Sequence, residues 1–588
     1  MLNIEGNRPF TVFFLLLVLL MAACRGSAGL PSLLPAGGPQ PTITLTPFQP
    51  RPNTPTAEQV AQDTPALQAT QLPPVPTTAA PAAPVAQAGI TLWVEPGLPQ
   101  DLRSSLRLPD GFGAAGDPQA AALRLRPGGG KPLSQWVYAL AAPFPTLQDG
   151  VSAEQIRRSW SGDPAGPFAG RPLFVDESTL AVFTALWGPP APGVVNSLPA
   201  GDLQSTTWEL RPSWAILPFE ALGPRWKVLE VDGLSPLRND FDPGAYALTV
   251  SFGLEGEERL VELTSVLYGP GSAAPLVVPT NRDPARLTVV AMTGVTALVR
   301  ATAFTMEQRG VRYPAKDVGE WLRSADIAHI SNEVPFAKKC PYPDPVQQGM
   351  RFCSDTRYIE LMEEVGTDIV ELTGDHFQDW GEEAMFYTLE LYRERGWPYY
   401  GGGEDAQDAR KPAIIEHNGN RLAFIGCNGK GGGYAQAGRD HPGAVVCDFD
   451  YLESEISRLA AEGYLVIATF QHFEYYTYRA QPDQERDFRR LASAGAVVVS
   501  GSQAHQPQAF EFDEGALIHY GLGNMFFDQL DVSPATRQAF VDRHTFYNGR
   551  YLGAELLTMM FVDYARPRPM TSGEREDLLR SVFNASGW

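Results

Sequence analysis

Histidine is absent from more than half of this chain. All eight histidines lie between His329 and His544, and the first 328 residues contain none. Cysteine is distributed in a similar way, because four of the five cysteines lie between Cys340 and Cys447 and only Cys24 comes earlier. Apart from Cys24, imidazole and thiol chemistry is therefore excluded from the first 328 residues. A site built on histidine is expected in the second half of the chain.

Positive charge is also scarce. Lys and Arg number 46 against 67 Asp and Glu, which gives a formal net charge of −21. Because the phosphates of nucleic acids are bound through positive fields, we expect no nucleic-acid partner. Hydrophobic residues make up 44% of the 588 residues. That fraction is enough for sizeable cores in roughly three or four domains, or in fewer large ones.

Long hydrophobic runs are missing except for one near the N-terminus. Phe10–Ala23 comes shortly after Arg8, and this run of 14 residues, apolar except for Thr11, is short for a membrane span but fits a signal peptide. It leads into Met21-Ala22-Ala23-Cys24, which resembles a bacterial lipobox with Met in place of the usual Leu. The resemblance implies that residues 1–24 are a lipoprotein signal peptide and that Cys24 is lipidated. A plain secretory signal with an incidental cysteine is the alternative.

Either signal predicts an extracytoplasmic protein, and the lipobox predicts one anchored to the membrane at the cell surface or in the periplasm. Residues 25–88 are rich in Pro, Thr, Ala and Gln and contain only four charged residues. A segment of this composition forms extended chain without a core. We therefore expect a disordered tether that holds the folded part away from the membrane.

Residues 89–280 show short alternating strands mixed with helical stretches. Ile90–Val94 alternates apolar and polar residues as a strand does, and Ser152–Trp160 is typical of a helix. The mixture predicts an α/β domain. The segments Phe144–Trp160 and Trp214–Leu237 resemble parts of periplasmic solute-binding domains, although no diagnostic motif is present. A structural or adaptor domain of unknown role is the alternative.

Helices and strands alternate regularly after residue 281, and polar residues follow four of the predicted strands. These residues are Asn332 and Glu333, Asp375 and His376, Gln471 and His472, and Gln503 and His505. Because ligands of open α/β sheets bind beyond the carboxyl ends of the strands, we expect these side chains to share one pocket. Singly, each has a structural alternative: Asp375 and Asp379 could cap a helix, and Glu333 could lie in a surface loop.

The other histidines are not expected in this pocket. His329 and His519 lie within predicted strands and are interpreted as structural. His417 lies in a polar turn, and His441 and His544 lie in polar segments where exposure is expected.

Six sequence blocks between residues 286 and 535 carry a family resemblance. They are Thr293-Gly294-Val295, Ser331-Asn332-Glu333, Gly374-Asp375-His376 with Asp379-Trp380-Gly381, Gln471-His472-Phe473-Glu474-Tyr475, Gly501-Ser502-Gln503-Ala504-His505, and Tyr520-Gly521-Leu522-Gly523-Asn524-Met525-Phe526-Phe527-Asp528. Their order resembles the CapA (poly-γ-glutamate biosynthesis) family of calcineurin-like metallophosphoesterases. The resemblance implies a sandwich of two mixed sheets flanked by helices over residues 281–565, with residues 566–588 as a C-terminal tail.

The resemblance also implies roles for the residues of the pocket. Glu333, Asp375, His472 and His505 would bind metal, and His376 with Asp375 would act in catalysis, His376 as general acid. The remaining pocket residues are Asn332, Asp379, Gln471, Glu474, Gln503 and Asn524.

Four positions depart from the family pattern. Asp375 stands where the family has a metal-binding Asn, and it could still bind a cation. Val295 stands where the first metal Asp is expected, and Gln471 and Gln503 stand where the family has histidine. A two-metal site typically needs a bridging carboxylate, whereas three ligands and a water suffice for one ion. The substitutions favour one divalent ion over two. If no ion binds, the pocket is a polar binding site on an old enzyme fold.

The four later cysteines form two local pairs. Twelve residues separate Cys340 from Cys353, and nineteen separate Cys427 from Cys447. In an exported protein this spacing predicts two disulfides, each stabilising by about 3 kcal/mol on the loop-entropy account. A zinc site is the alternative, but no C-x₂-C pair is present.

Two functions of different classes follow from these observations. The first is a membrane-anchored lipoprotein that handles capsular poly-γ-glutamate or another anionic envelope polymer, as a metal-dependent hydrolase if it is an enzyme. The second is a catalytically degenerate receptor for an envelope polymer or solute. A serine hydrolase built on Ser502 is disfavoured because the G-x-S-x-G turn is missing.

Overall fold

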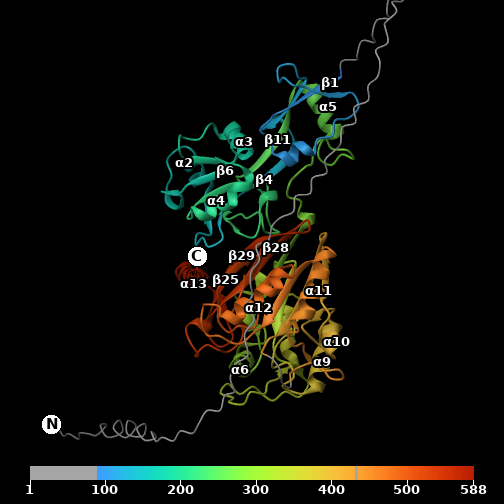
Figure 1. Cartoon of the computed structure of the whole chain (residues 1–588), viewed down its shortest axis with the longest axis vertical. Helices are drawn as coiled ribbons and strands as arrows, with labels where there is room; N and C mark the ends of the chain where they lie inside the picture. The colour runs from blue at the N-terminus through green and yellow to red at the C-terminus, as the bar shows by residue number, and fades with distance from the viewer. Residues whose placement is uncertain (1–88, 431–434) are drawn as a thin grey trace, which may run out of the picture. The chain divides into compact units, whose positions relative to one another are not determined.

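The computed structural model describes residues 89–430 and 435–588 (Figure 1). The predicted signal peptide, Cys24 and the tether lie outside the described residues. Among the described residues, no helix combines the length and the apolar character needed to cross a membrane. All of them belong to the unit Val85–Trp588, in which two sheet-based domains follow one another along the chain.

The first domain is built on a nine-stranded sheet with the order β2-β1-β3-β11-β4-β8-β6-β7, and β9 pairs with β4. The strands are β1 (Ile90–Val94), β2 (Phe112–Ala114), β3 (Leu123–Pro127), β4 (Lys131–Pro143), β6 (Leu173–Asp176), β7 (Val195–Leu198), β8 (Trp214–Pro218), β9 (Trp226–Val228) and β11 (Thr249–Gly256). The helices are α1 (Gln100–Ser104), α2 (Ala153–Trp160), α3 (Glu177–Trp187), α4 (Leu203–Glu209) and α5 (Glu258–Tyr268). The predicted mixed α/β character is present, whereas the resemblance to solute-binding domains is not confirmed.

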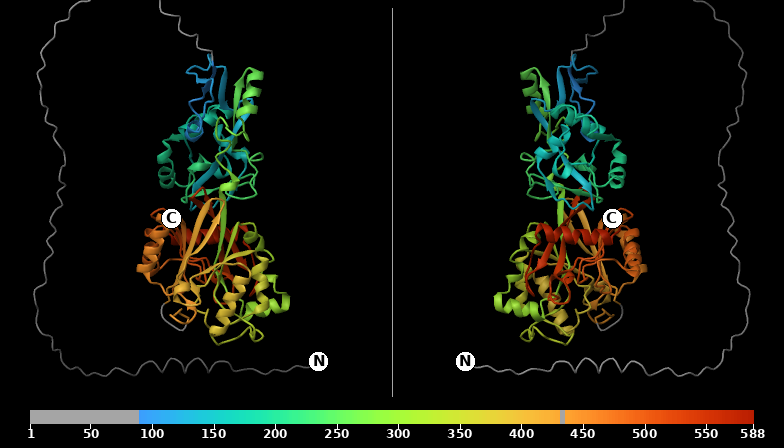
Figure 2. Two further views of the ribbon diagram at one scale, coloured as in Figure 1. Left: turned by 90° about the vertical axis from the view of Figure 1, so that its right-hand side faces the viewer. Right: turned by 90° about the vertical axis from the view of Figure 1, so that its left-hand side faces the viewer.

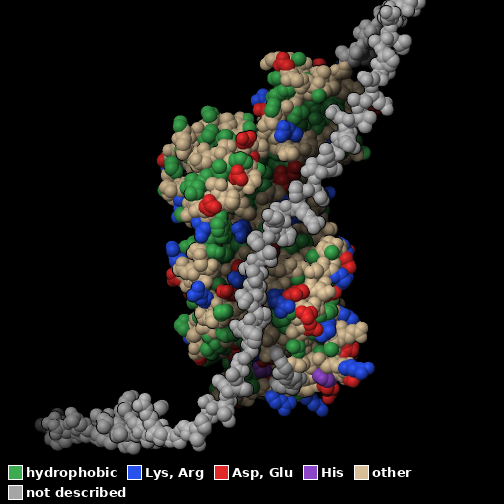
Figure 3. Space-filling view, in the orientation of Figure 1, with side chains coloured by type: hydrophobic (Ala, Val, Ile, Leu, Met, Phe, Trp, Pro, Cys, Tyr) green, Lys and Arg blue, Asp and Glu red, His purple; other side chains and the backbone are tan. Residues whose placement is uncertain are grey.

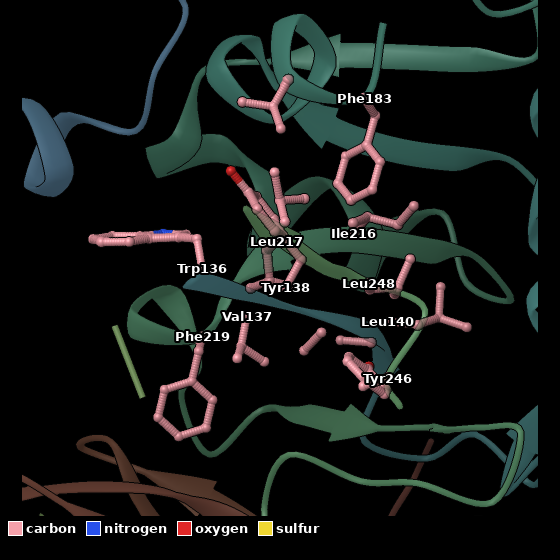
Figure 4. Packing of buried hydrophobic residues seen from close by; sticks show 14 of the residues in the cluster. Trp136, Val137, Tyr138, Leu140, Phe183, Ile216, Leu217, Phe219, Tyr246 and Leu248 are labelled. Atoms are coloured by element: carbon pink, nitrogen blue, oxygen red, sulfur yellow. The ribbon is translucent and has the colours of Figure 1, made fainter. Parts of the chain in front are cut away.

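Strand β4 forms the centre of this domain's core (Figure 4). Its residues Trp136–Ala142 are buried on both faces of the sheet. Tyr138 meets Phe183 of α3 edge to face with ring centroids 5.1 Å apart, an arrangement that adds to the area buried. The continuous apolar run of β4 is thus explained by cover on both sides, as in other fully buried strands.

The second domain contains two larger sheets. One has nine strands in the order β18-β17-β14-β12-β28-β29-β30 with β13 and β27 beside it, and the other has six in the order β20-β21-β23-β24-β26-β25. The first comprises β12 (Leu287–Thr293), β13 (Val295–Thr296), β14 (Ile327–Asn332), β17 (Thr367–Glu371), β18 (Tyr399–Tyr400), β27 (Asn524–Phe526), β28 (Gln538–Tyr547), β29 (Arg550–Phe561) and β30 (Pro567–Pro569). The second comprises β20 (Ala413–His417), β21 (Asn420–Asn428), β23 (Leu465–Gln471), β24 (Ala496–Ser500), β25 (Phe510–Asp513) and β26 (Ala516–His519).

The two sheets pack face to face, and helices cover their outer faces. Val290, Ile369, Phe424, Ile467 and Val498, drawn from both sheets, belong to one buried cluster. Helices α6 (Arg300–Arg309), α7 (Gly319–Arg323), α8 (Ile359–Glu364) and α9 (Glu382–Glu394) pack on one sheet, and α11 (Phe449–Ala461) and α12 (Pro482–Ser493) pack on the other. Figure 2 shows the orange and the green-yellow helices on opposite sides of the strands. Two mixed sheets flanked by helices are therefore present, as predicted.

Residues 566–588, expected as a tail, are an ordered part of this sandwich. They form β30 and α13 (Ser572–Ala585), which begins with a capping box between Thr571 and Glu574. Such a box pairs two backbone N–H groups that the first turn would otherwise leave free. Leu578 and Phe583 of α13 are buried in the core between the two sheets, so the C-terminal helix completes the second domain.

His544, expected to be exposed, is buried within β28. Only 1% of its surface is accessible, and its Nδ1 lies 2.8 Å from the hydroxyl of Tyr551. His329 in β14 is fully buried beside the Tyr400 hydroxyl at 2.8 Å. The expectation for His544 failed because its polar neighbours suggested a loop, whereas they lie in a strand that is paired on both edges. Burial lowers the pKa of His329 to about 3 and that of His544 to about 4.

These two histidines predict a loss of stability in acid. Both are neutral in the folded state and take up a proton in the unfolded state below about pH 6.5. The free energy of unfolding should therefore fall between about pH 6.5 and pH 4, by up to about 1.4 kcal/mol per pH unit for each group. Urea denaturation across this range measures the slope. The substitution His544→Gln should flatten it, and an unchanged slope would contradict the assignment of His544 as a buried neutral group.

Candidate metal site at the strand ends

The site forms where parallel strands of the two sheets end. Strands β14 and β17 are parallel neighbours, with Ser331 opposite Glu371 at their carboxyl ends. Glu333 follows β14 directly, and the loop after β17 carries Asp375 and His376. A Cβ on Gly374 would lie 2.8 Å from the Cα of Glu333, a distance that side chains do not tolerate. Glycine at this position lets the two loops approach closely enough to share a site.

Three of the predicted residues converge. Each of Glu333, Asp375 and His376 offers a donor atom, and the three atoms lie within 4.8 Å of one another. Glu333 is only 2% exposed. No hydrogen bond or ion pair reaches its carboxylate among the described residues. Burial raises the pKa of Glu333 to about 7, against the opposing charges of His376 and His505. A buried carboxylate without a partner is costly unless a cation compensates it, so this atom set fits a metal ion.

A carboxylate behind His376 orients its imidazole. The Nδ1 atom of His376 lies 2.7 Å from Oδ2 of Asp379, and the same oxygen accepts the backbone N–H of Phe352 at 2.9 Å. Burial opposes the charged imidazole, but Asp379, Glu333 and Asp375 outweigh it and raise the pKa of His376 to about 9. With Nδ1 occupied, Nε2 is the nitrogen left to face a ligand, as in carboxylate–histidine–metal arrangements.

Lys430, which was not among the predicted pocket residues, lies beside this set. The Nζ atom of Lys430 lies 2.7 Å from Asp375 Oδ2 and 2.6 Å from Glu474 Oε1. Gln471 donates to the other oxygen of Asp375 at 2.7 Å. Burial alone would raise the pKa of Asp375, but Lys430 and His376 hold it below its usual range. Lys430 follows β21 in a glycine-rich loop, and no sequence signal marks it as part of a site.

His505 lies next to the convergent set but outside it. Its Nε2 is 3.7 Å from Glu474, and its Nδ1 is 2.9 Å from the side-chain oxygen of Asn524. Its ring stacks on Phe527 with centroids 5.2 Å apart. Burial opposes the charged form of His505, but Glu474 and Glu333 raise its pKa. His505 therefore borders the pocket, with Asn524 fixing its ring.

His472, predicted as a ligand, is turned away from this set. Its Nε2 lies 3.0 Å from Asp487 of α12. Side chains alternate in direction along an extended chain. Since Gln471, the last residue of β23, points toward Asp375, the next side chain points to the helix side. Gln471 therefore occupies the place that the resemblance gave to histidine.

Two further predicted pocket residues, Gln503 and Asn332, make hydrogen bonds beneath the convergent set. Gln503 donates to the hydroxyl of Ser331. Asn332 donates to the carbonyl of Val334 and to the hydroxyl of Tyr392 in α9, both at 2.8 Å. Both side chains are buried, so they hold the loop ends together and do not present donors to a ligand.

The second domain is similar to known sequences. Residues 289–529 match the family described as bacterial capsule synthesis protein PGA_cap. The capsule biosynthesis protein CapA of Bacillus anthracis is 24% identical over 298 residues, which cover 50% of this chain and 71% of that protein. Residues 289–529 are therefore similar to the CapA family, from which they diverge at several positions. The PGA biosynthesis protein CapA of Bacillus subtilis (strain 168) is 23% identical over 287 residues, covering 48% of this chain and 74% of that protein.

The CapA match covers the second domain and leaves the first unassigned. A solved ABC-type phosphate transport receptor from Vibrio cholerae is 11% identical, with a TM-score of 0.24, covering 30% of this chain and 92% of that one. A similarity at this level does not establish the fold of any part of the chain. The solute-binding interpretation of residues 89–280 therefore stays a prediction.

The main difference between this CapA-like domain and the family pattern lies at Val295, and it affects packing as well as chemistry. Val295 is fully buried in a small apolar cluster with Ala297, Val299, Val334, Phe352 and Phe527. A carboxylate buried in this apolar cluster would be unfavourable without a compensating cation. The position that the resemblance gives to the family's first metal Asp is thus occupied by a packed apolar side chain, which cannot be a ligand.

Both predicted disulfides are confirmed. Cys340 is bonded to Cys353 and Cys427 to Cys447. Each bond closes a short loop, and each is expected to stabilise by about 3 kcal/mol on the loop-entropy account. The first loop reaches the site through Phe352, and the second begins at the end of β21, next to Lys430. The two disulfides fit an oxidising compartment.

Proposed function

We propose that this chain acts on the outer side of the cell membrane in the handling of capsular poly-γ-glutamate or a similar anionic envelope polymer. The names of the CapA relatives support the polymer. The observation that carries a chemical role is the convergence of Glu333, Asp375 and His376 within 4.8 Å. A degenerate receptor without bound metal is not favoured, because it leaves the buried carboxylate of Glu333 without a partner.

We assign one divalent ion to this site rather than two. Glu333, Asp375 and His376 would hold it, with Asp379 orienting the imidazole. A second ion lacks its ligand at Val295, and the ammonium group of Lys430 already neutralises Asp375 and Glu474. The single ion would polarise an acyl or anionic group of the substrate. In this arrangement His376 is a ligand instead of the general acid implied by the family resemblance.

The CapA-like domain is proposed to work while tethered. Cys24 would carry a lipid, and residues 25–88 would reach from the membrane to the first domain. The two disulfides support export to an oxidising compartment. Mass analysis of the N-terminal peptide tests the anchor: we expect a diacylated Cys24, and an unmodified cysteine would contradict it.

The metal and polymer assignments are tested together on the full chain. After dialysis against Mn²⁺ or Zn²⁺, we expect about one ion per chain and binding or cleavage of γ-linked glutamate oligomers. An α-linked glutamate oligomer of the same length is the control for charge alone. Equal behaviour toward both oligomers would contradict a role specific to poly-γ-glutamate, and polymer binding that is unaffected by chelation would favour the receptor.

A further inference from the structure

A second pocket lies beside the metal site, under the loop closed by the Cys340–Cys353 disulfide. Its volume is about 250 Å³, and its walls include Arg300, Tyr342, Gln347, Arg351, Phe352 and Trp380. This volume is slightly below the range typical of pockets for drug-sized ligands. The pocket therefore has room for one residue of a chain or a small acid.

The charged side chains that line this pocket are all positive. Its charged residues are Arg300 and Arg351, and no acidic side chain lines it. No ion pair of Arg351 is found among the described residues. Its Nε donates to the carbonyl of Asp379 at 3.1 Å, and its guanidinium lies 5.7 Å from the ring of Trp380. The chain carries a net charge of −21, and acidic and basic side chains are interspersed over the second domain in Figure 3. An arginine left without a carboxylate in such a chain is a candidate for binding an external anion.

Arg300 is held at the inner end of the pocket in an unusual conformation. Its φ angle is 45°, in a region that non-glycine residues rarely adopt and that persists where surrounding contacts enforce it, often at binding sites. Its guanidinium lies 5.2 Å from the rings of both Phe352 and Phe527. Asp528 pairs with it and also accepts the N–H of Ala301 at the start of α6. Its Nε is buried and has no hydrogen-bond partner.

The pocket shares a wall with the metal site. The ring of Phe352 lies 4.9 Å from that of His376, and the N–H of Phe352 is bonded to Asp379. Arg351 is bonded to the carbonyl of the same Asp379. A ligand in this pocket would therefore contact the loop that fixes the His376 imidazole, and a chain could extend from one site to the other.

We propose that this pocket binds the carboxylate of one residue of an acidic chain while a neighbouring residue of that chain occupies the metal site. The guanidinium fork of Arg351 matches a carboxylate in geometry and charge, and Tyr342, Phe352 and Trp380 pack against the apolar stem of the bound residue. The proposal rests on the proposed function for the polymer, but the pocket itself is tested separately with a small dicarboxylate.

The test compares Arg351 variants of the metal-loaded full chain by calorimetry, with γ-linked glutamate oligomers and glutarate as probes. Arg351→Gln should weaken both interactions by about tenfold or more, the loss of roughly 1.4 kcal/mol, and Arg351→Lys should retain part of the affinity. Metal content should not change, because Arg351 is not a ligand. Arg312→Gln is the matched control, since the side chain of Arg312 is 63% exposed and forms ion pairs with Glu360 and Glu364 outside this pocket.

Different results would overturn different parts. If Arg351→Gln and the charge reversal Arg351→Glu bind both probes as tightly as the wild type, the pocket assignment is wrong while the metal-site proposal stands. If glutarate binding depends on Arg351 but the oligomer does not bind, the polymer assignment is wrong and the pocket stands. If inorganic phosphate binds this pocket more tightly than glutarate in a competition titration, the pocket selects phosphate. The assignment of a carboxylate as its ligand is then wrong.

Discussion

The substitution Glu333→Gln is expected to abolish stoichiometric metal binding. Glutamine keeps the shape of the side chain but removes the buried carboxylate charge, to which no described residue donates a hydrogen bond. The affinity for a divalent ion should fall by more than about 100-fold, beyond the usual cost of losing an outer-shell partner. Elemental analysis after dialysis measures the change, and any polymer cleavage should disappear with the ion. Folding should be maintained, because an amide is easier to bury than a carboxylate.

A second buried glutamate provides the control for this experiment. Glu371 is fully buried, but its carboxylate accepts hydrogen bonds from Ser502 at 2.6 Å and from Thr373 at 2.7 Å. It lies outside the convergent set, so Glu371→Gln should leave one ion per folded chain. Retention of metal in Glu333→Gln, or its loss in both variants alike, would show that the ion is bound elsewhere or that folding explains the loss.

The substitution Lys430→Met is expected to increase metal binding. The ammonium group of Lys430 neutralises Asp375 and Glu474, which lie at 2.7 and 2.6 Å from its Nζ. Without the ammonium group, the carboxylates of Asp375 and Glu474 keep their negative charge but have lost the cation that neutralised them. Both remain close to His505. A second divalent ion is then the natural replacement, since carboxylate and imidazole are its usual ligands. The stoichiometry should rise from about one ion per chain toward two.

Lys411→Met is the matched control, because Lys411 is 65% exposed and pairs with Asp408 away from the site. It should leave the stoichiometry unchanged. If Lys430→Met instead removes the single ion, then Lys430 supports the first ion and does not stand in for a second. Lys430→Arg, which keeps the positive charge, should behave like the wild type in either case.

Polar residues that directly follow parallel strands were expected to share a pocket, and this holds where their position depends on local chain order. Glu333, Asp375 and His376 directly follow strands that are recognisable from their apolar runs, and parallel strands bring their carboxyl ends together. The same argument misplaced His472, because a shift of one residue along an extended chain reverses the direction of the side chain. Sequence alone could not decide whether Gln471 or His472 faces the pocket.

Other features depended on partners that are distant along the chain. Lys430, after β21, reaches Glu474, after β23, and Arg351 forms no ion pair within residues 89–430 and 435–588. His544 was expected in an exposed polar segment, but it is buried because β28 is paired on both edges. The two disulfides were predictable because each closes a short loop, so nearness in sequence was enough.

The sequence by itself determined the resemblance of the second domain to CapA proteins, the alternation of strands and helices, the two local disulfides and the apolar residue at Val295. These depend on residue identity and on order along the chain. Only the tertiary structure decided which side chains share the site, that a lysine occupies part of it, and that an arginine-lined pocket adjoins it. The reason is physical: charge compensation, burial and convergence depend on distances between segments far apart in sequence, and those distances are set by the packing of the two sheets.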